Sequence, residues 1–223
     1  MTELILIRHG ETDWNVEKRL QGHHDITLNA EGERQAQALA RRLKDEPIDA
    51  IYSSDLQRAY LTAQAIAEVR GMPILAEEGL RERCFGAFEG SLHPELAQRY
   101  PDDYAALQRR DVDARYPRGE FECETLTEFN RRTLDCVARI AAAGHRRVLV
   151  VTHGGVLDCV YRRATGMALN LPRSFDVLNA SLNHVQWDGE QATILKWADV
   201  AHLGSRAEGA LDEIDARHKI FPA

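Results

Sequence analysis

Two histidines lie close after the two longest apolar runs of the chain, and a glycine follows each histidine. Leu4–Ile7 leads into Arg8-His9-Gly10, and Val148–Val151 leads into Thr152-His153-Gly154. Apolar runs of this length predict buried strands. In open α/β sheets, ligands bind outside the carboxyl ends of the strands. We therefore expect His9 and His153 to lie at one ligand site.

The residues around the two histidines favour binding of an anion, and phosphate is the anion that we expect. A glycine after a strand lets the backbone approach a ligand, and the helix that follows offers unpaired N–H groups. Arg8 adds a fixed cation, and Arg58, in the first turn of a predicted helix, adds another. Each residue alone is typical of an ordinary turn or a solvated helix. In combination they predict a phosphate pocket.

A metal site is the natural alternative for paired histidines. The sequence has no H-x-x-x-H or H-E-x-x-H spacing, and arginines beside the histidines would repel a cation. The four cysteines include no C-x-x-C pair, so neither a zinc site nor a disulfide framework is expected. Because the ligand spacings are missing and cations stand beside the histidines, we predict no metal. The same cations favour a different role, because they lower the pKa of a nearby histidine and a neutral imidazole can act as a nucleophile.

Composition excludes several other classes of function. The 223 residues are 44% hydrophobic, which is enough for a sizeable core. The net charge of −7 argues against a nucleic-acid partner, because such binding needs a basic surface. The longest apolar runs are far below spanning length, and the first residues lack the pattern of a signal peptide. We expect no membrane partner and a cytoplasmic location.

The segments after the first strand alternate between helix and strand patterns. Asn29 can cap a helix with an apolar stripe, and Asp49–Ser53 is typical of a short strand. Ser54 and Gln57 have the spacing of a capping box, which predicts a helix ending near Gly71. The alternation predicts a three-layer α/β/α fold with a mostly parallel central sheet, helices on both faces and a small inserted cap region.

The second half continues the pattern after an irregular insert. Residues 80–121 are broken by glycines and prolines and form the predicted cap. Thr125 and Glu128 make a second capping box, which opens an amphipathic helix. The strand Val148–Thr152 and another apolar-faced helix follow.

The end of the chain predicts a hairpin and then a tail. Leu182–Trp187 and Ala192–Trp197 flank Asp188-Gly189, a hairpin signal. With no internal repeat or linker, we expect one domain over residues 1–205 and a C-terminal tail over 206–223.

Four segments resemble, in order, the motifs of the histidine phosphatase superfamily, also called the phosphoglycerate mutase-like family. They are "RHGET" with a later asparagine, "YSSDLQRAYLTA", "LRERCFGAFEG" and "VVTHGGVL", and the resemblance runs from Glu3 to about Cys159. Each motif alone is weak, whereas four in the family's order are specific. The resemblance implies an enzyme of the histidine acid phosphatase type.

The resemblance also implies a role for each matched residue. His9 would accept the phosphoryl group, with Arg8, Arg58 and His153 around the phosphoryl oxygens. Glu82 would protonate the leaving oxygen and then take a proton from the attacking water, which requires a carboxyl group protonated near neutral pH. The predicted substrate-binding residues are Thr12, Asn15, Gln21, Gly22, Arg83 and Gly154.

These residues predict metal-independent hydrolysis of a small phosphorylated metabolite through a phosphohistidine. A phosphoglycerate mutase is the main alternative, and it would use 2,3-bisphosphoglycerate as phosphoryl donor; otherwise no cofactor is expected. The compact stretch between Glu82 and His153 and the Phe88-Glu89-Gly90 segment favour the phosphatase, whereas Glu82-Arg83 resembles the mutases. A non-catalytic phospholigand-binding module is a third alternative, and the retained nucleophile and acid argue against it.

The leaving alcohol is not identified by any of these motifs. Arg83, Arg109 and Arg110 are candidates for binding a second anionic group of the substrate, because arginine pairs with carboxylates and phosphates in a bidentate manner. The oligomeric state is predicted only as monomer or homodimer.

Overall fold

The computed structural model describes residues 1–189 and 191–206, and a six-stranded sheet in the order β3-β2-β4-β1-β5-β6 forms its centre. Pairing is parallel from β3 to β1 and antiparallel for β1 with β5 and for β5 with β6. The mostly parallel sheet and the terminal hairpin are thus confirmed. The strands are β1 (Thr2–Arg8), β2 (Ala50–Ser53), β3 (Ile74–Ala76), β4 (Arg147–Thr152), β5 (Leu182–Trp187) and β6 (Ala192–Asp199).

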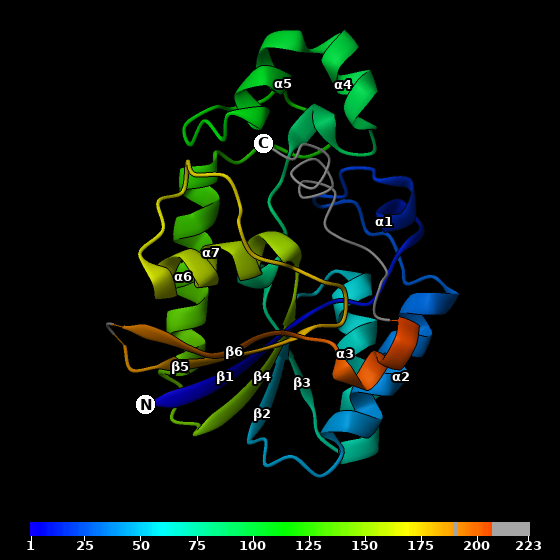
Figure 1. The fold of residues 1–223 in the computed structure, drawn as a ribbon, viewed down its shortest axis with the longest axis vertical. Helices are drawn as coiled ribbons and strands as arrows, with labels where there is room; N and C mark the ends of the chain where they lie inside the picture. The colour runs from blue at the N-terminus through cyan, green and yellow to red at the C-terminus, as the bar shows by residue number, and fades with distance from the viewer. Residues whose placement is uncertain (190, 207–223) are drawn as a thin grey trace.

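Helices cover both faces of the sheet, which confirms the three-layer fold (Figure 1). α2 (Ala30–Leu43) and α3 (Gln57–Arg70) pack on one face. α6 (Leu126–Ala141) and α7 (Gly154–Thr165) pack on the other. No helix in the described part of the chain has the length and apolar character needed to cross a bilayer.

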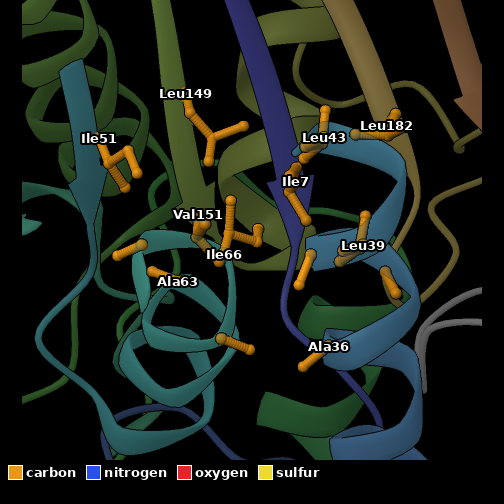
Figure 2. Close-up of a cluster of buried hydrophobic side chains, with 14 of the residues drawn as sticks. Ile7, Ala36, Leu39, Leu43, Ile51, Ala63, Ile66, Leu149, Val151 and Leu182 are labelled. Atoms are coloured by element: carbon orange, nitrogen blue, oxygen red, sulfur yellow. The ribbon is translucent and has the colours of Figure 1, made fainter. Parts of the chain in front are cut away.

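The strands are apolar at consecutive positions because both of their faces are buried. Successive side chains of β1 alternate between the two faces, so Ile7 packs towards α2 and α3 while Leu6 packs towards α6 and α7. Figure 2 shows the first of these layers, in which Ile66 of α3 lies beside Val151 of β4 and Leu39 of α2 lies on the side of Ile7 of β1. This packing holds the ends of β1 and β4, and hence both histidines, in fixed positions.

The predicted helix caps are confirmed at α2 and α6. The Asn29 side chain accepts a hydrogen bond from the backbone N–H of Gly32 at 2.8 Å. At α6, the backbone N–H of Glu128 donates to the Thr125 hydroxyl at 3.1 Å, and the backbone N–H of Thr125 donates to the Glu128 carboxylate at 2.9 Å. Both caps satisfy N–H groups that a helix start otherwise leaves without acceptors.

The capping box predicted at Ser54 is wrong. α3 begins at Gln57 after Leu56, whose side chain makes no capping bond. The Ser54 hydroxyl lies 2.8 Å from Nε2 of His153, and the Gln57 side chain donates to Asp25. Ser54 therefore has a partner 99 residues away, immediately after β4, which a local sequence pattern does not reveal. The other end of this helix is as predicted, because Gly71 ends it in the left-handed conformation.

The segment 80–121 contains α4 (His93–Arg99) and α5 (Pro101–Gln108), which lie together at one end of the molecule (Figure 1). Its own apolar cluster is centred on Phe88, whose ring stacks on Tyr116 at 4.4 Å between centroids. A short helix, α1 (Asp13–Glu17), follows β1, and a 3-10 segment spans Ala201–Arg206. Beyond Arg206, the predicted tail lies outside the described residues.

Candidate active site

A cavity lies at the carboxyl end of β1, between the sheet and the cap, and its empty space, counted together with the open solvent at its mouth, is about 730 Å³. One part of its lining is polar or charged and another is apolar. The lining residues are Arg8, His9, Leu20, Gln21, Gly22, Arg58, Glu82, Arg83, Phe85, Leu107, Arg110, Leu126, Phe129, Gly155, Asp158 and Arg173.

His9 is held immediately after β1 in a defined tautomer. Its backbone N–H donates to the Thr152 carbonyl at 2.9 Å, and its Nδ1 lies 2.7 Å from the Gly10 carbonyl oxygen. A carbonyl oxygen can only accept, so Nδ1 carries the hydrogen. The lone pair of a neutral His9 ring is therefore on Nε2, which is the arrangement a histidine nucleophile needs.

His153 follows β4 and lies beside His9, with 5.2 Å between ring centroids. It is fully buried, and its Nε2 lies 2.8 Å from the Ser54 hydroxyl. Burial is the largest cause that lowers the pKa of His153 well below 6.5, and the nearby Arg58 guanidinium lowers it further. His153 is thus a neutral imidazole at pH 7, although it is not itself part of the cavity lining.

Two buried arginines bring positive charge to the cavity and are bonded to backbone carbonyls. Arg8 donates to the Val177 carbonyl at 2.8 Å, and its Nε has no acceptor among the residues that the structure describes. Arg58 donates to the carbonyls of Gly22 and His24, both at 2.8 Å. A carbonyl oxygen carries no formal negative charge, so these hydrogen bonds do not neutralise a guanidinium, and the positive charge that both side chains bring suits an anionic ligand.

Gly22 lies where no side chain would fit. Its φ is +52°, and a Cβ there would come within 1.9 Å of Oε1 of Glu89. Glu89 is itself buried, and this oxygen accepts a hydrogen bond from the backbone N–H of Phe85 at 2.8 Å. Burial raises the pKa of the Glu89 carboxyl above its ordinary value. Glu89 thus packs the Gly22 loop against the cap, a role that the Phe88-Glu89-Gly90 pattern did not indicate.

Glu82 enters the cavity from the cap and is held at the N-terminus of α7. One carboxylate oxygen accepts from the backbone N–H of Arg83 at 2.7 Å, and the other accepts from the backbone N–H of Gly155 at 2.9 Å. A Cβ on residue 155 would lie 2.1 Å from Oε1 of Glu82. Glycine at 155 therefore makes room for the carboxylate beside the positive end of the helix.

This site has recognisable relatives. The sequence profile of the histidine phosphatase superfamily (branch 1) matches residues 4–200. The chain belongs to this superfamily. The phosphoglycerate mutase-like protein 4 of Arabidopsis thaliana is 40% identical to it over 206 residues, covering 90% of this chain and 86% of that protein. The metal-independent phosphoserine phosphatase of the same plant is 40% identical over 209 residues, covering 92% and 84%.

A solved structure shows the same likeness in three dimensions. YhfR of Bacillus stearothermophilus superposes with a TM-score of 0.82 at 32% identity, covering 91% of this chain and 100% of that one. The resemblance noted in the sequence is thereby confirmed as family membership. Within residues 1–189 and 191–206 of this histidine phosphatase, no group of three or more His, Cys, Asp or Glu side chains is placed to hold a metal ion.

Other residues predicted for the histidine phosphatase site lie away from the cavity lining. Thr12 and Asn15 bond to each other at the start of α1, with the Asn15 backbone N–H donating to the Thr12 hydroxyl at 3.2 Å. Asn179 links this turn to the active site, because its amide donates to the His9 carbonyl at 2.9 Å. Gly154 and Arg109 are also absent from the lining, whereas Arg83 and Arg110 are part of it.

Two charged residues of the lining, Asp158 and Arg173, were missed by sequence reasoning. Asp158 interrupts the apolar run "VLDCV" of α7, and a carboxylate inside such a run is a signal for a buried ion pair. Arg173 lies in a loop with no such pattern, so nothing local marks it. Leu126 and Phe129 belong to the amphipathic helix predicted after Thr125, and they also line the cavity.

Proposed function

We propose that this histidine phosphatase hydrolyses small phosphomonoesters through a phosphohistidine on His9, without a metal cofactor. The observation that carries the proposal is the convergence on one cavity of a histidine in the nucleophilic tautomer, two buried arginines and a carboxylate. A relative named as a metal-independent phosphoserine phosphatase supports the same chemistry. The set supplies a nucleophile, an anion clamp and a proton carrier.

The reaction takes two steps. In the first, Nε2 of His9 forms a bond to phosphorus while the bond from phosphorus to the alcohol oxygen breaks, and the Glu82 carboxyl gives its proton to that oxygen. In the second, water attacks phosphorus, the phosphorus–nitrogen bond breaks, and the Glu82 carboxylate takes a proton from the water. Arg8 and Arg58 stabilise the charge on the phosphoryl oxygens in both steps.

Release of phosphate from p-nitrophenyl phosphate in the presence of EDTA tests the proposal. We expect turnover by the wild type and a loss of at least about ten-thousandfold in His9→Ala, because that variant lacks the phosphoryl acceptor. His145→Ala is the matched control, since His145 precedes β4 at the end of the strand opposite His153. Equal rates for His9→Ala and the wild type would remove His9 from the mechanism.

The phosphoglycerate mutase reaction is the second candidate, because a relative carries a mutase-like name and the first step would be the same. Incubation with 3-phosphoglycerate, with and without 2,3-bisphosphoglycerate, separates the two. We expect phosphate release to exceed formation of 2-phosphoglycerate. Rapid isomerisation without comparable phosphate release would overturn the phosphatase assignment.

Four narrower expectations stay predictions. They are the histidine acid phosphatase type, the absence of a cofactor, the cytoplasmic location and a monomeric or homodimeric state. The proposed catalytic set does not depend on the oligomeric state, since every side chain in it comes from one chain.

A further inference from the structure

The His153 ring has one nitrogen bonded to a side chain and one nitrogen without a partner. Its Nε2 lies 2.8 Å from the hydroxyl oxygen of Ser54, and both residues are fully buried. Its Nδ1 is also buried and has no hydrogen-bond partner among residues 1–189 and 191–206. A neutral imidazole carries its hydrogen on one nitrogen and a lone pair on the other. The position of that hydrogen therefore decides what His153 can offer to a ligand.

The contacts of Ser54 determine where the hydrogen lies. Besides the His153 ring, the Ser54 hydroxyl contacts the backbone N–H of Leu56, at 3.3 Å. An N–H group can only donate, so the hydroxyl oxygen accepts this bond and its own hydrogen is still available. Nε2 of His153 is the only acceptor that this hydrogen meets in the part of the chain that the structure describes. Ser54 therefore donates to Nε2, and a neutral His153 carries its hydrogen on Nδ1.

The sheet fixes this pair of side chains. Ser54 directly follows β2 and His153 directly follows β4, and the two strands are parallel neighbours. The backbone N–H of Ser54 also donates to the Val151 carbonyl of β4, at 2.9 Å. The hydroxyl is thus held beside the ring by the main chain on both sides.

The Nδ1–H group of His153 is left with an unmet need. A buried donor without an acceptor is costly, and a ligand oxygen beside it would remove that cost. The ring centroid of His153 is 5.2 Å from that of His9, so a phosphoryl group on His9 would come next to it. Phosphoryl oxygens accept hydrogen bonds, whereas a lone pair on Nδ1 would repel them.

We propose that Ser54 is a positioning residue, whose hydroxyl fixes His153 in the tautomer that donates from Nδ1–H to an oxygen of the phosphoryl group on His9. This inference rests on the proposed phosphatase function. It adds to that function a residue for which the sequence indicated only a helix cap.

The tautomer is measured by two-bond proton–nitrogen correlation NMR of protein with isotope-labelled histidine, and His153→Asn assigns the signals by their loss. For the wild type at pH 7.5 we expect the Nδ1–H form. In Ser54→Ala the nearby cations Arg8 and Arg58 favour a lone pair on Nδ1, so the Nδ1–H form should become a minority. Ser54→Thr keeps a hydroxyl and should restore it.

Ser53→Ala is the matched control for Ser54→Ala. Ser53 is the neighbouring buried serine, and its hydroxyl donates to the Ser54 carbonyl at 2.8 Å rather than to a ring. We expect a lower unfolding temperature in this variant and an unchanged His153 tautomer. If Ser54 had a packing role alone, Ser54→Ala would behave in the same way.

Binding of inorganic phosphate, measured by calorimetry, tests the donor role without turnover. In Ser54→Ala we expect Kd to rise roughly three- to thirtyfold, because only the minority tautomer binds. In Ser54→Thr and Ser53→Ala it should stay within about twofold of the wild type. kcat/KM should fall in Ser54→Ala by a similar factor for alkyl and aryl phosphates, since they share the phosphoryl group.

A wild-type His153 with its hydrogen on Nε2 would overturn the proposal, and this spectrum decides even if Ser54→Ala does not fold. A rise in Kd below threefold in a folded Ser54→Ala would overturn it as well. If phosphate binding follows the hydroxyl but the wild type hydrolyses neither alkyl phosphates nor p-nitrophenyl phosphate, the proposed function fails and the role of Ser54 in binding stands.

Discussion

The floor and the roof of the cavity are built in different ways. The floor, defined here as the lining residues Arg8, His9 and Arg58 together with His153 beside His9, lies at the ends of strands and in the first turn of α3. The roof, defined here as the cap residues Glu82, Arg83, Phe85, Leu107 and Arg110, comes from a segment of short helices and loops. Floor residues follow or adjoin strands of the packed sheet, whereas roof residues belong to a segment that packs around the cap's own apolar cluster.

The floor and the roof also have different roles in the proposed reaction. The floor faces the phosphoryl group, which every phosphomonoester shares, and rigid strand ends suit a part of the substrate that never varies. The roof faces the leaving alcohol, which varies from substrate to substrate. Loops on a fixed scaffold are the usual place for such variation. Substitutions in the floor should therefore affect all substrates equally, and substitutions in the roof should not.

After His9→Ala, the largest effect is expected in the floor, from Arg58→Gln. Arg58 supplies positive charge to the cavity and bonds the Gly22 and His24 carbonyls, so its loss removes charge stabilisation and loosens the loop. We expect kcat/KM to fall about a thousandfold for alkyl and aryl phosphates alike. Steady-state kinetics on both classes checks this prediction.

Arg70→Gln is the control for Arg58→Gln, because Arg70 ends the same helix and bonds the Lys44 and Glu46 carbonyls. It should lower the unfolding temperature and leave kcat/KM within about twofold of the wild type. If Arg58→Gln affected one substrate class ten times more than the other, the floor would not act on the shared phosphoryl group alone.

The next effect is expected in the roof, from Glu82→Gln. An amide cannot deliver a proton to the leaving oxygen, so an alkyl phosphate with a poor leaving group should lose about a hundredfold or more in kcat. p-Nitrophenol leaves without a proton, and its ester should lose tenfold or less. The ratio of the two losses is the measurement. Glu78→Gln, at an exposed carboxylate nearby, should change neither rate.

The same contrast explains how far the sequence could predict the site. His9 and His153 were placed correctly together because each follows a strand that its apolar run already marks, and adjacent parallel strands end at one edge of the sheet. The caps at Asn29 and Thr125 were correct because their partners lie three residues away. These features are local, or depend only on strand order.

Features that depend on distant partners were missed or misread. Ser54 has capping-box spacing, but its hydroxyl bonds His153, 99 residues away. The Gly155 backbone N–H meets the Glu82 carboxylate across 73 residues, and Arg173 reaches Asp158 from a loop without a pattern. A single sequence carries no periodicity for such pairs. The arrangement of the floor was therefore predictable from the sequence, and the contacts of the roof were not.

A smaller effect is expected where floor and roof meet, from Gly155→Ala. The new Cβ would lie 2.1 Å from Oε1 of Glu82 and 3.0 Å from the Phe129 ring, so the carboxylate must shift. We expect about a tenfold loss of kcat on alkyl phosphates and a smaller loss on p-nitrophenyl phosphate, in the same direction as Glu82→Gln. An equal loss on both substrates would instead place the damage in the floor.

The smallest effect is on stability. It separates the contribution of His153, in the floor, to the pH dependence of the free energy of unfolding from that of the rest of the molecule. The pKa of His153 is lowered well below 6.5 by burial and by Arg58. Below pH 6.5 His153 therefore becomes protonated in the unfolded chain but stays neutral in the folded chain. The free energy of unfolding falls as the pH falls for this reason. One such group contributes at most about 1.4 kcal/mol per pH unit between its folded pKa and 6.5.

His153→Asn isolates this contribution, because burial also lowers the pKa of His23 and His202 and those groups persist in the variant. Urea unfolding of both proteins at pH 7.5, 6.5 and 5.5 gives the difference in slope. We expect the wild type to lose more stability than His153→Asn between pH 6.5 and 5.5, by up to about 1.4 kcal/mol. Above pH 6.5 the difference between the two slopes should fade and be nearly gone by pH 7.5, because the unfolded His153 is then almost as neutral as the folded one. Parallel curves below pH 6.5 would mean that folded His153 takes up a proton in that range, and the floor would then hold a third cation beside its two arginines.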